Sequence, residues 1–299
     1  MEKTEIYGKI SCIVYDHLTY FTTEVADHLK LPTTLLRPSK SQLLDPVPKV
    51  PLLRFKDLPF ILTYEIPEPL LQLLEKVTNL GSSVVIIWNT IEHLENRALS
   101  WLQQHYDQVP IFTIGHLHKI ASSLLTSLAE EDASCIFWLD TQATNYVLYV
   151  SLGSIVVMDK NEFIETAWGL FNRILYFLWV IRSNNSMGVW NSIELLNGYL
   201  EAIGDRGRIV KWAPQKDVLS HRAIGGFWSH CGWNSTLECI LQGVPMICRL
   251  CFGDQKVNAR YLTHVWMVGL ELGPDDLSRY VIESTIRKLM VDEEGKQLK

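Results

Sequence analysis

The 299-residue chain lacks any long apolar run, and no stretch approaches the roughly 18–20 consecutive apolar residues that a membrane-spanning helix needs. Residues 1–6 have neither the basic start nor the apolar core of a secretory signal peptide. An excess of basic residues is also lacking, because the formal net charge is −6. Basic surfaces bind phosphate backbones, so we expect no nucleic acid among the main partners. These absences predict a cytoplasmic protein without a membrane span.

Cysteine is scarce, and six residues are too few at this length for a disulfide scaffold, which favours a reducing compartment. Cys248 and Cys251 form a C-x-x-C motif, and Cys231 and Cys239 precede them. A zinc site needs a second close pair on loops, whereas seven residues separate Cys231 from Cys239. Cys248 also lies within the apolar run 244–248. We therefore interpret these cysteines as buried thiols and expect no metal.

Two nucleotide-binding motifs are missing as well. No G-x-G-x-x-G sequence follows an expected strand, and the chain has no G-x-x-x-x-G-K-[ST] loop, so nothing supports a dehydrogenase or a P-loop kinase. His116 and His118 form an H-x-H pair, but no cysteine or carboxylate lies close enough in sequence to complete a metal site. We interpret residues 115–118 as a loop that follows a strand at 111–114.

The chain does contain enough apolar sequence for a sizeable core. Hydrophobic residues make up 47% and charged residues 20%, a balance that excludes a disordered chain. The length predicts about two domains. Apolar runs typical of buried strands alternate with stretches of helical period. The strands are expected at residues 11–15, 84–88, 146–150, 177–181, 209–210 and 225–228.

This alternation predicts an α/β fold, because strands separated by helices form parallel βαβ units with right-handed crossovers. One helix is expected over residues 159–170, and the proline-rich stretch 38–59 is expected to be a loop. The polar stretch 128–134 is the best candidate for a linker. We expect two Rossmann-like halves, divided into an N-terminal domain over 1–127, a linker region over 128–140 and a C-terminal domain over 141–299.

Residues 212–255 are the most informative segment. A strand is expected to lead into a turn containing Gly232, and a helix is expected to open at Asn234 or Ser235 and to end at Gly243. Such a helix N-terminus, at the carboxyl ends of a parallel sheet, binds anions through free N–H groups and the positive end of the helix dipole. Side chains that could hydrogen-bond a phosphate there are His230, Asn234 and Ser235.

Two of these features have a purely structural alternative. Ser235 and Glu238 fit the S-x-x-E capping box, in which side chains satisfy the first N–H groups of a helix. On residue type alone, Trp212 and Trp233 fit packing at the core or its rim better than stacking on a ligand. The residue pattern alone leaves both alternatives open.

The whole segment resembles the donor-binding signature box of plant family-1 UDP-glycosyltransferases. The likeness runs from Trp212-Ala213-Pro214-Gln215 to Asp254-Gln255, over the full 44 residues of the box. Further likeness lies in residues 51–59, 134–140 and 149–154. The resemblance implies a GT-B fold with two Rossmann-like domains built on parallel sheets. It also implies transfer of a sugar from a UDP-sugar to a small lipophilic plant metabolite, with inversion at the anomeric carbon.

By the family's pattern, each part of the donor meets its own residues. The uridine is expected to contact Trp212 by stacking, Ala213 and Gln215 through the base, and Glu238 through the ribose diol. The diphosphate is expected to be held by His230, Gly232, Asn234, Ser235 and Ser154. The sugar hydroxyls are expected to be read by Trp233, Asp254 and Gln255. A closing glutamine is associated with glucose in this family, so UDP-glucose is the expected donor, without a metal or other cofactor.

Asp16 is the candidate catalytic residue outside this segment. It follows the strand expected at 11–15, where catalytic groups gather in open α/β sheets, although a helix N-cap or turn aspartate fits equally well. The resemblance favours catalysis, since Asp16 matches the family aspartate that orients a histidine base. In that mechanism the histidine takes the acceptor's proton and the aspartate stabilises the imidazolium.

The sequence departs from the family pattern on its acceptor side. The base histidine normally precedes that aspartate, but none of residues 1–15 is a histidine, and His17 is expected to point away from Asp16. The segment after Arg37 is short, and the chain stops at Lys299 before the family's final helices. The resemblance therefore implies an incomplete N-terminal domain. Two functions stay open: a monomeric UDP-glucose-dependent transferase, and a catalytically impaired protein that retains UDP-sugar binding.

Overall fold

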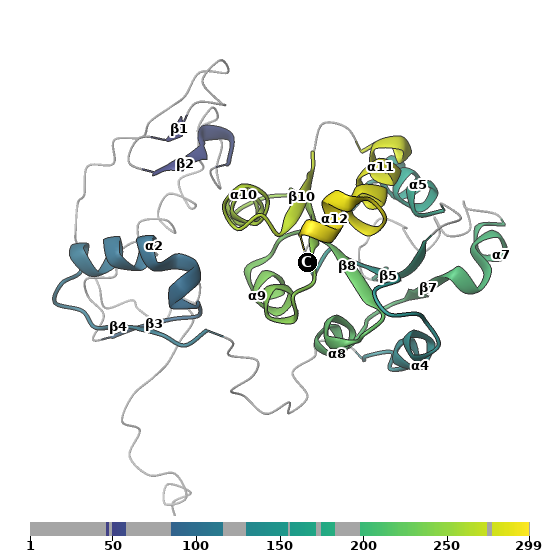
Figure 1. Ribbon diagram of the computed structural model, residues 1–299, viewed down its shortest axis with the longest axis horizontal. Coiled ribbons are helices and arrows are strands. Elements are labelled where there is room, and N and C mark those ends of the chain that lie inside the picture. Colours follow the sequence, from purple (N-terminus) through teal and green to yellow (C-terminus); the bar gives the residue numbers. More distant parts are fainter. Residues whose placement is uncertain are drawn as a thin grey trace, which may run out of the picture. The chain divides into compact units, whose positions relative to one another are not determined.

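The computed structural model describes residues 46–47, 50–57, 85–115, 130–154, 156–171, 175–182, 198–273 and 277–298. The chain divides into two compact units, which Figure 1 shows as ribbons. The first unit comprises residues 1–38 and 62–117, and the second comprises residues 39–61 and 118–299. The helices of the described residues include none that is long and apolar enough to cross a membrane.

The first unit contains a βαβ crossover. Strands β3 (Ile86–Trp88) and β4 (Ile111–Thr113) pair in parallel with Ile86 opposite Ile111, and helix α2 (Glu92–His105) connects them. The strands expected at 84–88 and 111–114 are thereby confirmed with slightly narrower bounds. The strand expected at 11–15 lies outside the described residues.

The second unit is built on a six-stranded sheet in which every pairing is parallel. Its order is β10-β9-β8-β5-β6-β7, so the chain starts in the middle, runs to one edge, returns and runs to the other edge. The strands are β5 (Val147–Ser151), β6 (Tyr176–Val180), β7 (Gly207–Val210), β8 (Ile224–Ser229), β9 (Met246–Arg249) and β10 (Gly269–Leu272). The expected strands 146–150, 177–181, 209–210 and 225–228 are confirmed. Strand order reverses between β5 and β8, and ligands of open α/β sheets bind at the carboxyl ends of strands beside such a point.

Helices cover both faces of this sheet, as Figure 1 shows for α5, α11 and α12 on one side and α4, α8 and α9 on the other. The helices and short turns are α4 (Ser134–Asp140), α5 (Lys160–Leu170), α7 (Tyr199–Ile203), η5 (Gly204–Arg206), α8 (Gln215–Ser220), α9 (Trp233–Gln242), α10 (Gln255–Arg260), η6 (Tyr261–Val265), α11 (Arg279–Met290) and α12 (Glu293–Gln297). Neighbouring strand residues alternate between two hydrophobic clusters: Leu148 and Val150 pack in one, Val147 and Tyr149 in the other. This is the alternation that a strand buried on both faces requires.

Helix α5 follows its sequence pattern closely. The Asp159 carboxylate accepts the backbone N–H of Glu162 at 2.9 Å and caps the helix, while Phe163, Ala167 and Leu170 are buried against the sheet. Because an N-cap carboxylate satisfies one of the orphan N–H groups, the helix starts where the predicted range starts.

Helix α4 differs from its prediction. The sequence predicts a linker region that includes residues 134–140, but these residues form a helix whose Cys135 and Leu139 are fully buried in a cluster with Val147. These residues therefore belong to the core of the second unit. The domain boundaries as a whole stay a prediction.

The proline-rich stretch also differs from the expected loop. Strands β1 (Pro46–Val47) and β2 (Val50–Arg54) pair antiparallel, and a single 3₁₀ turn, η3 (Phe55–Asp57), follows. A proline is compatible with this pairing because a two-stranded sheet has only edge strands. The Arg260 side chain of α10 donates to the Leu52 carbonyl at 3.0 Å, so this segment packs within the second unit.

Candidate functional site

The candidate site lies where β5 and β8 end. Ser151 at the end of β5 is opposite Ser229 at the end of β8, so the turns that follow these strands are neighbours. The turn after β5 contains Gly153 at φ +68°, and the turn after β8 contains Cys231 at φ +62°. Both turns therefore use the left-handed backbone region that tight reversals need.

His230 packs between two glycines. A Cβ atom on Gly153 would stand 2.6 Å from the His230 Nε2 atom, and a Cβ atom on Gly232 would stand 2.5 Å from it. Neither position has room for a larger residue unless the imidazole moves. Close packing against Gly153 and Gly232, which have no side chains, therefore fixes the ring of His230 at the junction of the two turns.

Burial makes His230 a neutral group at this junction. Desolvation lowers the pKa of His230 to about 4, while the Asp254 carboxylate raises it and the Arg182 guanidinium lowers it by smaller amounts. Its Nδ1 atom is buried and has no hydrogen-bond partner among the described residues. A neutral imidazole offers one donor and one acceptor, so His230 can hydrogen-bond a ligand without bringing a charge.

Helix α9 begins earlier than the sequence pattern predicts. Its N-cap is Gly232, whose carbonyl accepts the N–H of Thr236 at 2.9 Å, and no side chain caps the helix. Ser235 is thus the third helical residue and is too far into the helix to serve as its N-cap. The capping-box interpretation of Ser235 and Glu238 is therefore wrong, and the start expected at Asn234 or Ser235 is late. The predicted end is confirmed, because Gly243 caps the C-terminus at φ +65°.

Gln215 connects α8 to α9 through its side-chain amide. Its Nε2 atom donates to Glu238 Oε2 at 2.7 Å and to Ser235 Oγ at 3.0 Å. The buried Tyr149 hydroxyl donates to Gln215 Oε1 at 3.4 Å, a long bond. Three residues that the sequence placed around the donor therefore form one polar cluster, and the Glu238 carboxylate has acceptor capacity left for a hydroxyl.

The two tryptophans are half-buried, so neither belongs to the interior core. Trp233 lies near Trp266, with ring centroids 6.4 Å apart at a tilt of 45°. The Trp212 carbonyl accepts the N–H of Asp132 at 2.9 Å, and the next residue, Ala213, is buried. The structure thus places both rings at the rim of the second unit, and stacking on a ligand stays a prediction.

Asp254 and Gln255 lie at the start of α10. Asp254 is exposed and accepts from Asn258 Nδ2 at 3.0 Å, while Gln255 is only 5% exposed and accepts the N–H of Phe252 at 3.1 Å. The same Asn258 amide donates to the Cys231 carbonyl at 2.9 Å, which ties α10 to the turn beside His230. Sequence reasoning missed Asn258, although its spacing of four residues from Asp254 on one helix was a usable signal.

Ser154 is exposed on the turn after β5, and its carbonyl accepts a hydrogen bond from Arg182. Asn234 is exposed in the first turn of α9. Asp16, His17, His116 and His118 lie outside the described residues. The structure therefore joins Gln215, Ser235 and Glu238 and places Gly232 beside His230. The donor roles of the predicted residues stay a prediction, and the structure does not bear on the predicted catalytic aspartate.

The described cysteines are all free thiols. Cys135, Cys231, Cys239 and Cys248 are buried, and burial raises the pKa of the Cys231 and Cys239 thiols well above the ordinary range. The described residues contain no group of three or more His, Cys, Asp or Glu side chains arranged to hold a metal ion. These thiols pack as small apolar side chains.

Comparison with known proteins places the chain in a family. The sequence model of the family described as "UDP-glucoronosyl and UDP-glucosyl transferase" matches residues 70–297. The chain belongs to this family. It is 50% identical over 315 residues to UDP-glycosyltransferase 76E1 of Solanum lycopersicum and 43% identical over 318 residues to flavonol 3-O-glucosyltransferase UGT76E12 of Arabidopsis thaliana. These alignments cover 97% and 98% of this chain and 66% and 69% of the relatives, so the chain spans about two thirds of their length.

Solved structures of plant members of the family share the fold. A UDP-glucose:anthocyanidin 3-O-glucosyltransferase in complex with UDP matches with a TM-score of 0.73 and 27% identity, covering 88% of this chain and 57% of that chain. Phytolacca americana UGT2, complexed with UDP-2-fluoro-glucose and pterostilbene, matches with a TM-score of 0.73 and 30% identity, covering 94% and 60%. The α/β GT-B fold class with parallel sheets, expected from the sequence, is confirmed.

Proposed function

We propose that this chain binds a UDP-sugar at the β5–β8 switch point and transfers the sugar to a small lipophilic plant metabolite with inversion. The observation that carries the proposal is that two clusters lie beside the carboxyl ends of the central strands β5 and β8. One is the Gln215–Ser235–Glu238 cluster, and the other is His230 held between Gly153 and Gly232. Structural neighbours were solved with UDP and with UDP-2-fluoro-glucose, which supports the same class of donor here.

The first cluster suits the uridine half of the donor. A carboxylate accepts from both hydroxyls of a ribose diol, and Glu238 is already oriented by the Gln215 amide. We assign Trp212 to stacking on uracil, with Ala213 and Gln215 beside the base. The half-buried position of Trp212 leaves part of the indole accessible to a ligand.

The second cluster suits the diphosphate. Its assigned ligands are the uncapped N-terminus of α9 with the side chains or backbone of His230, Gly232, Asn234, Ser235 and Ser154. N–H groups without side-chain caps and the positive end of the helix dipole stabilise the charge that develops on a departing diphosphate. We therefore propose that donor binding needs no metal cofactor.

The start of α10 suits the sugar. We assign Asp254, Gln255 and Trp233 to the sugar hydroxyls and propose glucose as the preferred sugar. Asn258 donates both to Asp254 and to the Cys231 carbonyl beside His230, which supports adjacent positions for the sugar and the diphosphate.

The chemical step requires a base on the acceptor side. A base takes the proton of the acceptor hydroxyl, the oxygen attacks the anomeric carbon from the face opposite UDP, and the bond between that carbon and the UDP oxygen breaks. We assign Asp16 to orienting the base and to stabilising its cationic form. A UDP-sugar-binding protein without turnover is the second candidate, since the contacts that support this proposal all belong to the assigned donor site.

Calorimetry and a turnover assay test this function. We expect UDP and UDP-glucose to bind, UDP-galactose to bind more weakly, and UDP to be released with some member of a panel of phenolic and terpenoid acceptors. Binding without release with any acceptor would overturn the transferase proposal in favour of the second candidate, and no binding would overturn both. Light scattering on the same sample tests the proposed monomer, which we place in the cytoplasm.

A further inference from the structure

Arg182 lies just after the end of β6, outside every set of residues assigned above. Strand β6 pairs directly with β5, so Arg182 stands beside the turn that follows β5. Its guanidinium donates through one NH2 group to the Ser154 carbonyl and through the other to the Val156 carbonyl, the latter at 2.8 Å. The planar fork of one side chain therefore holds two peptide groups of this turn.

The turn needs such support. A small pocket lies against it, lined by Leu152, Gly153, Val156, Phe163 and Arg182 among others, so apolar packing alone does not fill the space around it. Gly153 packs against the His230 ring, and a displacement of the turn would move the surface on which that ring rests. The position of Arg182 is thus linked through Gly153 to the position of His230.

The charge balance of the site also involves Arg182. The side chains assigned to the diphosphate are neutral at neutral pH, including His230, whose pKa burial lowers to about 4. The nearby Asp254 carboxylate adds negative charge. Among the described residues, no carboxylate lies within ion-pair distance of Arg182, whose hydrogen bonds there go to carbonyl groups. Within the part of the chain that the structure describes, its positive charge therefore faces this region without a fixed counter-ion.

We propose that Arg182 is a positioning residue for the donor diphosphate. It fixes the Gly153–Ser154 turn against His230 and supplies positive charge to a site whose diphosphate ligands are otherwise neutral. The inference rests on the proposed UDP-sugar function and specifies its diphosphate end. It predicts that Arg182 contributes to the binding of phosphate groups and not to the binding of the nucleoside.

A ligand series separates this role from a structural one. The variants Arg182→Met and Arg182→Lys are titrated with UDP, UMP and uridine by calorimetry, with NMR titration for the weak uridine complex. We expect Arg182→Met to weaken UDP binding by about tenfold, UMP binding by less, and uridine binding by less than about twofold. Arg182→Lys keeps the charge and loses the fork, so it should recover part of the UDP affinity.

Arg279→Met is the matched control, because Arg279 is held by a bidentate ion pair with Glu165 on α5 and not by the carbonyl groups of the turn after β5. This variant should bind all three ligands like the parent chain. Equal losses of UDP and uridine affinity in Arg182→Met, or unchanged UDP affinity, would overturn the proposal. If Arg182→Met does not fold by circular dichroism, Arg182→Lys decides on the same criteria. Failure of the parent chain to bind any of the ligands would instead overturn the proposed function and this inference with it.

Discussion

The Gln215 amide joins Ser235 and Glu238, and this contact separates two explanations of the same motif. Glu238 bonds Gln215 at 2.7 Å and does not cap α9, so its removal should affect ligand binding more than helix stability. We predict that Glu238→Ala weakens UDP binding by roughly 1–3 kcal/mol, the usual value for a lost charged hydrogen bond. Calorimetry with UDP measures the change.

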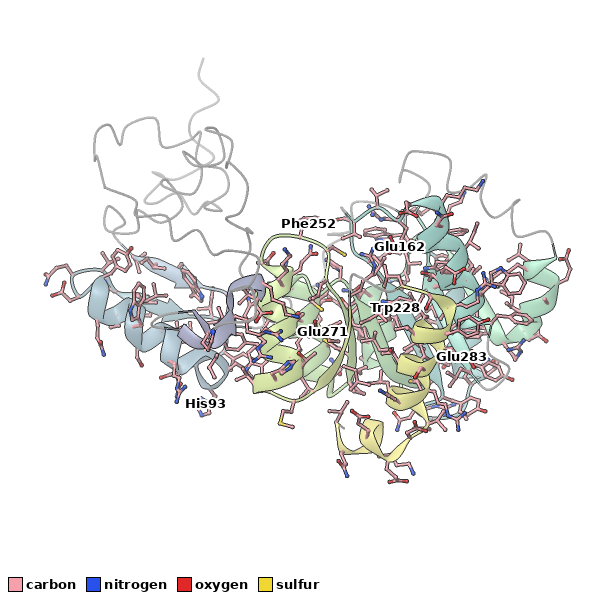
Figure 2. All side chains as sticks on the ribbon, turned by 90° about the horizontal axis from the view of Figure 1, so that it is seen from above. His93, Glu162, Trp228, Phe252, Glu271 and Glu283 are labelled. Carbon is pink, nitrogen blue, oxygen red and sulfur yellow. The ribbon has the colours of Figure 1, made fainter. Side chains whose placement is uncertain are left out.

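The exposed Glu283 on α11, labelled in Figure 2, provides the control variant Glu283→Ala, which should bind UDP like the parent chain. A melting temperature that falls in Glu238→Ala while UDP affinity stays level would contradict the ligand role.

The neutral state of His230 predicts a dependence of stability on pH. An unfolded histidine titrates near 6.5, whereas burial lowers the folded pKa to about 4. Between these values the unfolded chain binds more protons, so the free energy of unfolding falls as the pH drops from about 6.5 to about 4, by roughly 3 kcal/mol from this group. Above pH 6.5 the group adds no slope. Urea unfolding at several pH values, compared with His230→Gln, tests this, and an equal slope in both proteins would contradict it.

At the residue scale, the sequence predicted which residues belong to the candidate site better than it predicted the hydrogen bonds between them. The motif identified Gln215, Ser235 and Glu238, because their types and spacing are what a nucleotide site needs. Arg182 was not predicted, and neither was the bond from Asn258 to the Cys231 carbonyl, since these partners are backbone carbonyls of turns 28 and 27 residues away in sequence. Such partners follow from the order of strands in the sheet and not from local pattern.

At the scale of elements, predictions of helix and strand positions were wrong where a contact in the fold outweighed a local sequence rule. The S-x-x-E pattern predicted the start of α9 too late. The helix begins at Trp233, because Gly232 in the turn after β8 is already its N-cap. Proline content predicted a loop over 38–59, yet β1 and β2 pair there. Helix α5 was predicted well, because its cap and its apolar face agree with each other.

The segment of β2 and η3 packs in the second unit through one buried carboxylate. Asp57, only 4% exposed, accepts the backbone N–H and the side chain of Arg54 at 2.8 Å and lies 3.6 Å from Arg260 of α10. Arg54 and Lys56 also lie 3.9 Å from Glu271, which Figure 2 labels on β10. Burial alone would raise the pKa of Asp57, but the Arg54 hydrogen bonds and the two arginine charges lower it overall.

Removal of this carboxylate charge should loosen the segment locally. Asp57→Asn keeps the shape but leaves Arg54 and Arg260 without their shared anion, which favours local opening. We predict that trypsin cleaves after Arg54 and Lys56 several-fold faster than in the parent chain, since proteolysis follows local opening. Mass spectrometry of timed digests measures the rate. Asp205→Asn, at an exposed position, is the control, and equal cleavage in all three proteins would contradict the role of Asp57.

At the scale of the whole molecule, composition and alternation were enough for the α/β class, because strand and helix periods are local properties. The assignment of residues to units was harder. Residues 39–61 group with the second unit although residues 62–117 follow them in the first. The hydrogen bond between Arg260 and Leu52 joins residues that are 208 positions apart. Local sequence patterns cannot predict a contact over such a separation.

The described residues of the candidate site all lie in the second unit, so donor binding should stabilise the two units unequally. At a UDP concentration of 100 times the dissociation constant, linkage predicts about 2.7 kcal/mol of added stability for the part of the chain that must fold to bind. Because two units need not unfold as one, hydrogen exchange resolved by segment is the suitable measurement. We expect UDP to slow exchange in the turns after β5 and β8 and in α9, and to leave β3, α2 and β4 unchanged. Glu238→Ala at the same UDP concentration should show much less protection. Equal protection in both units would contradict a donor site confined to the second one.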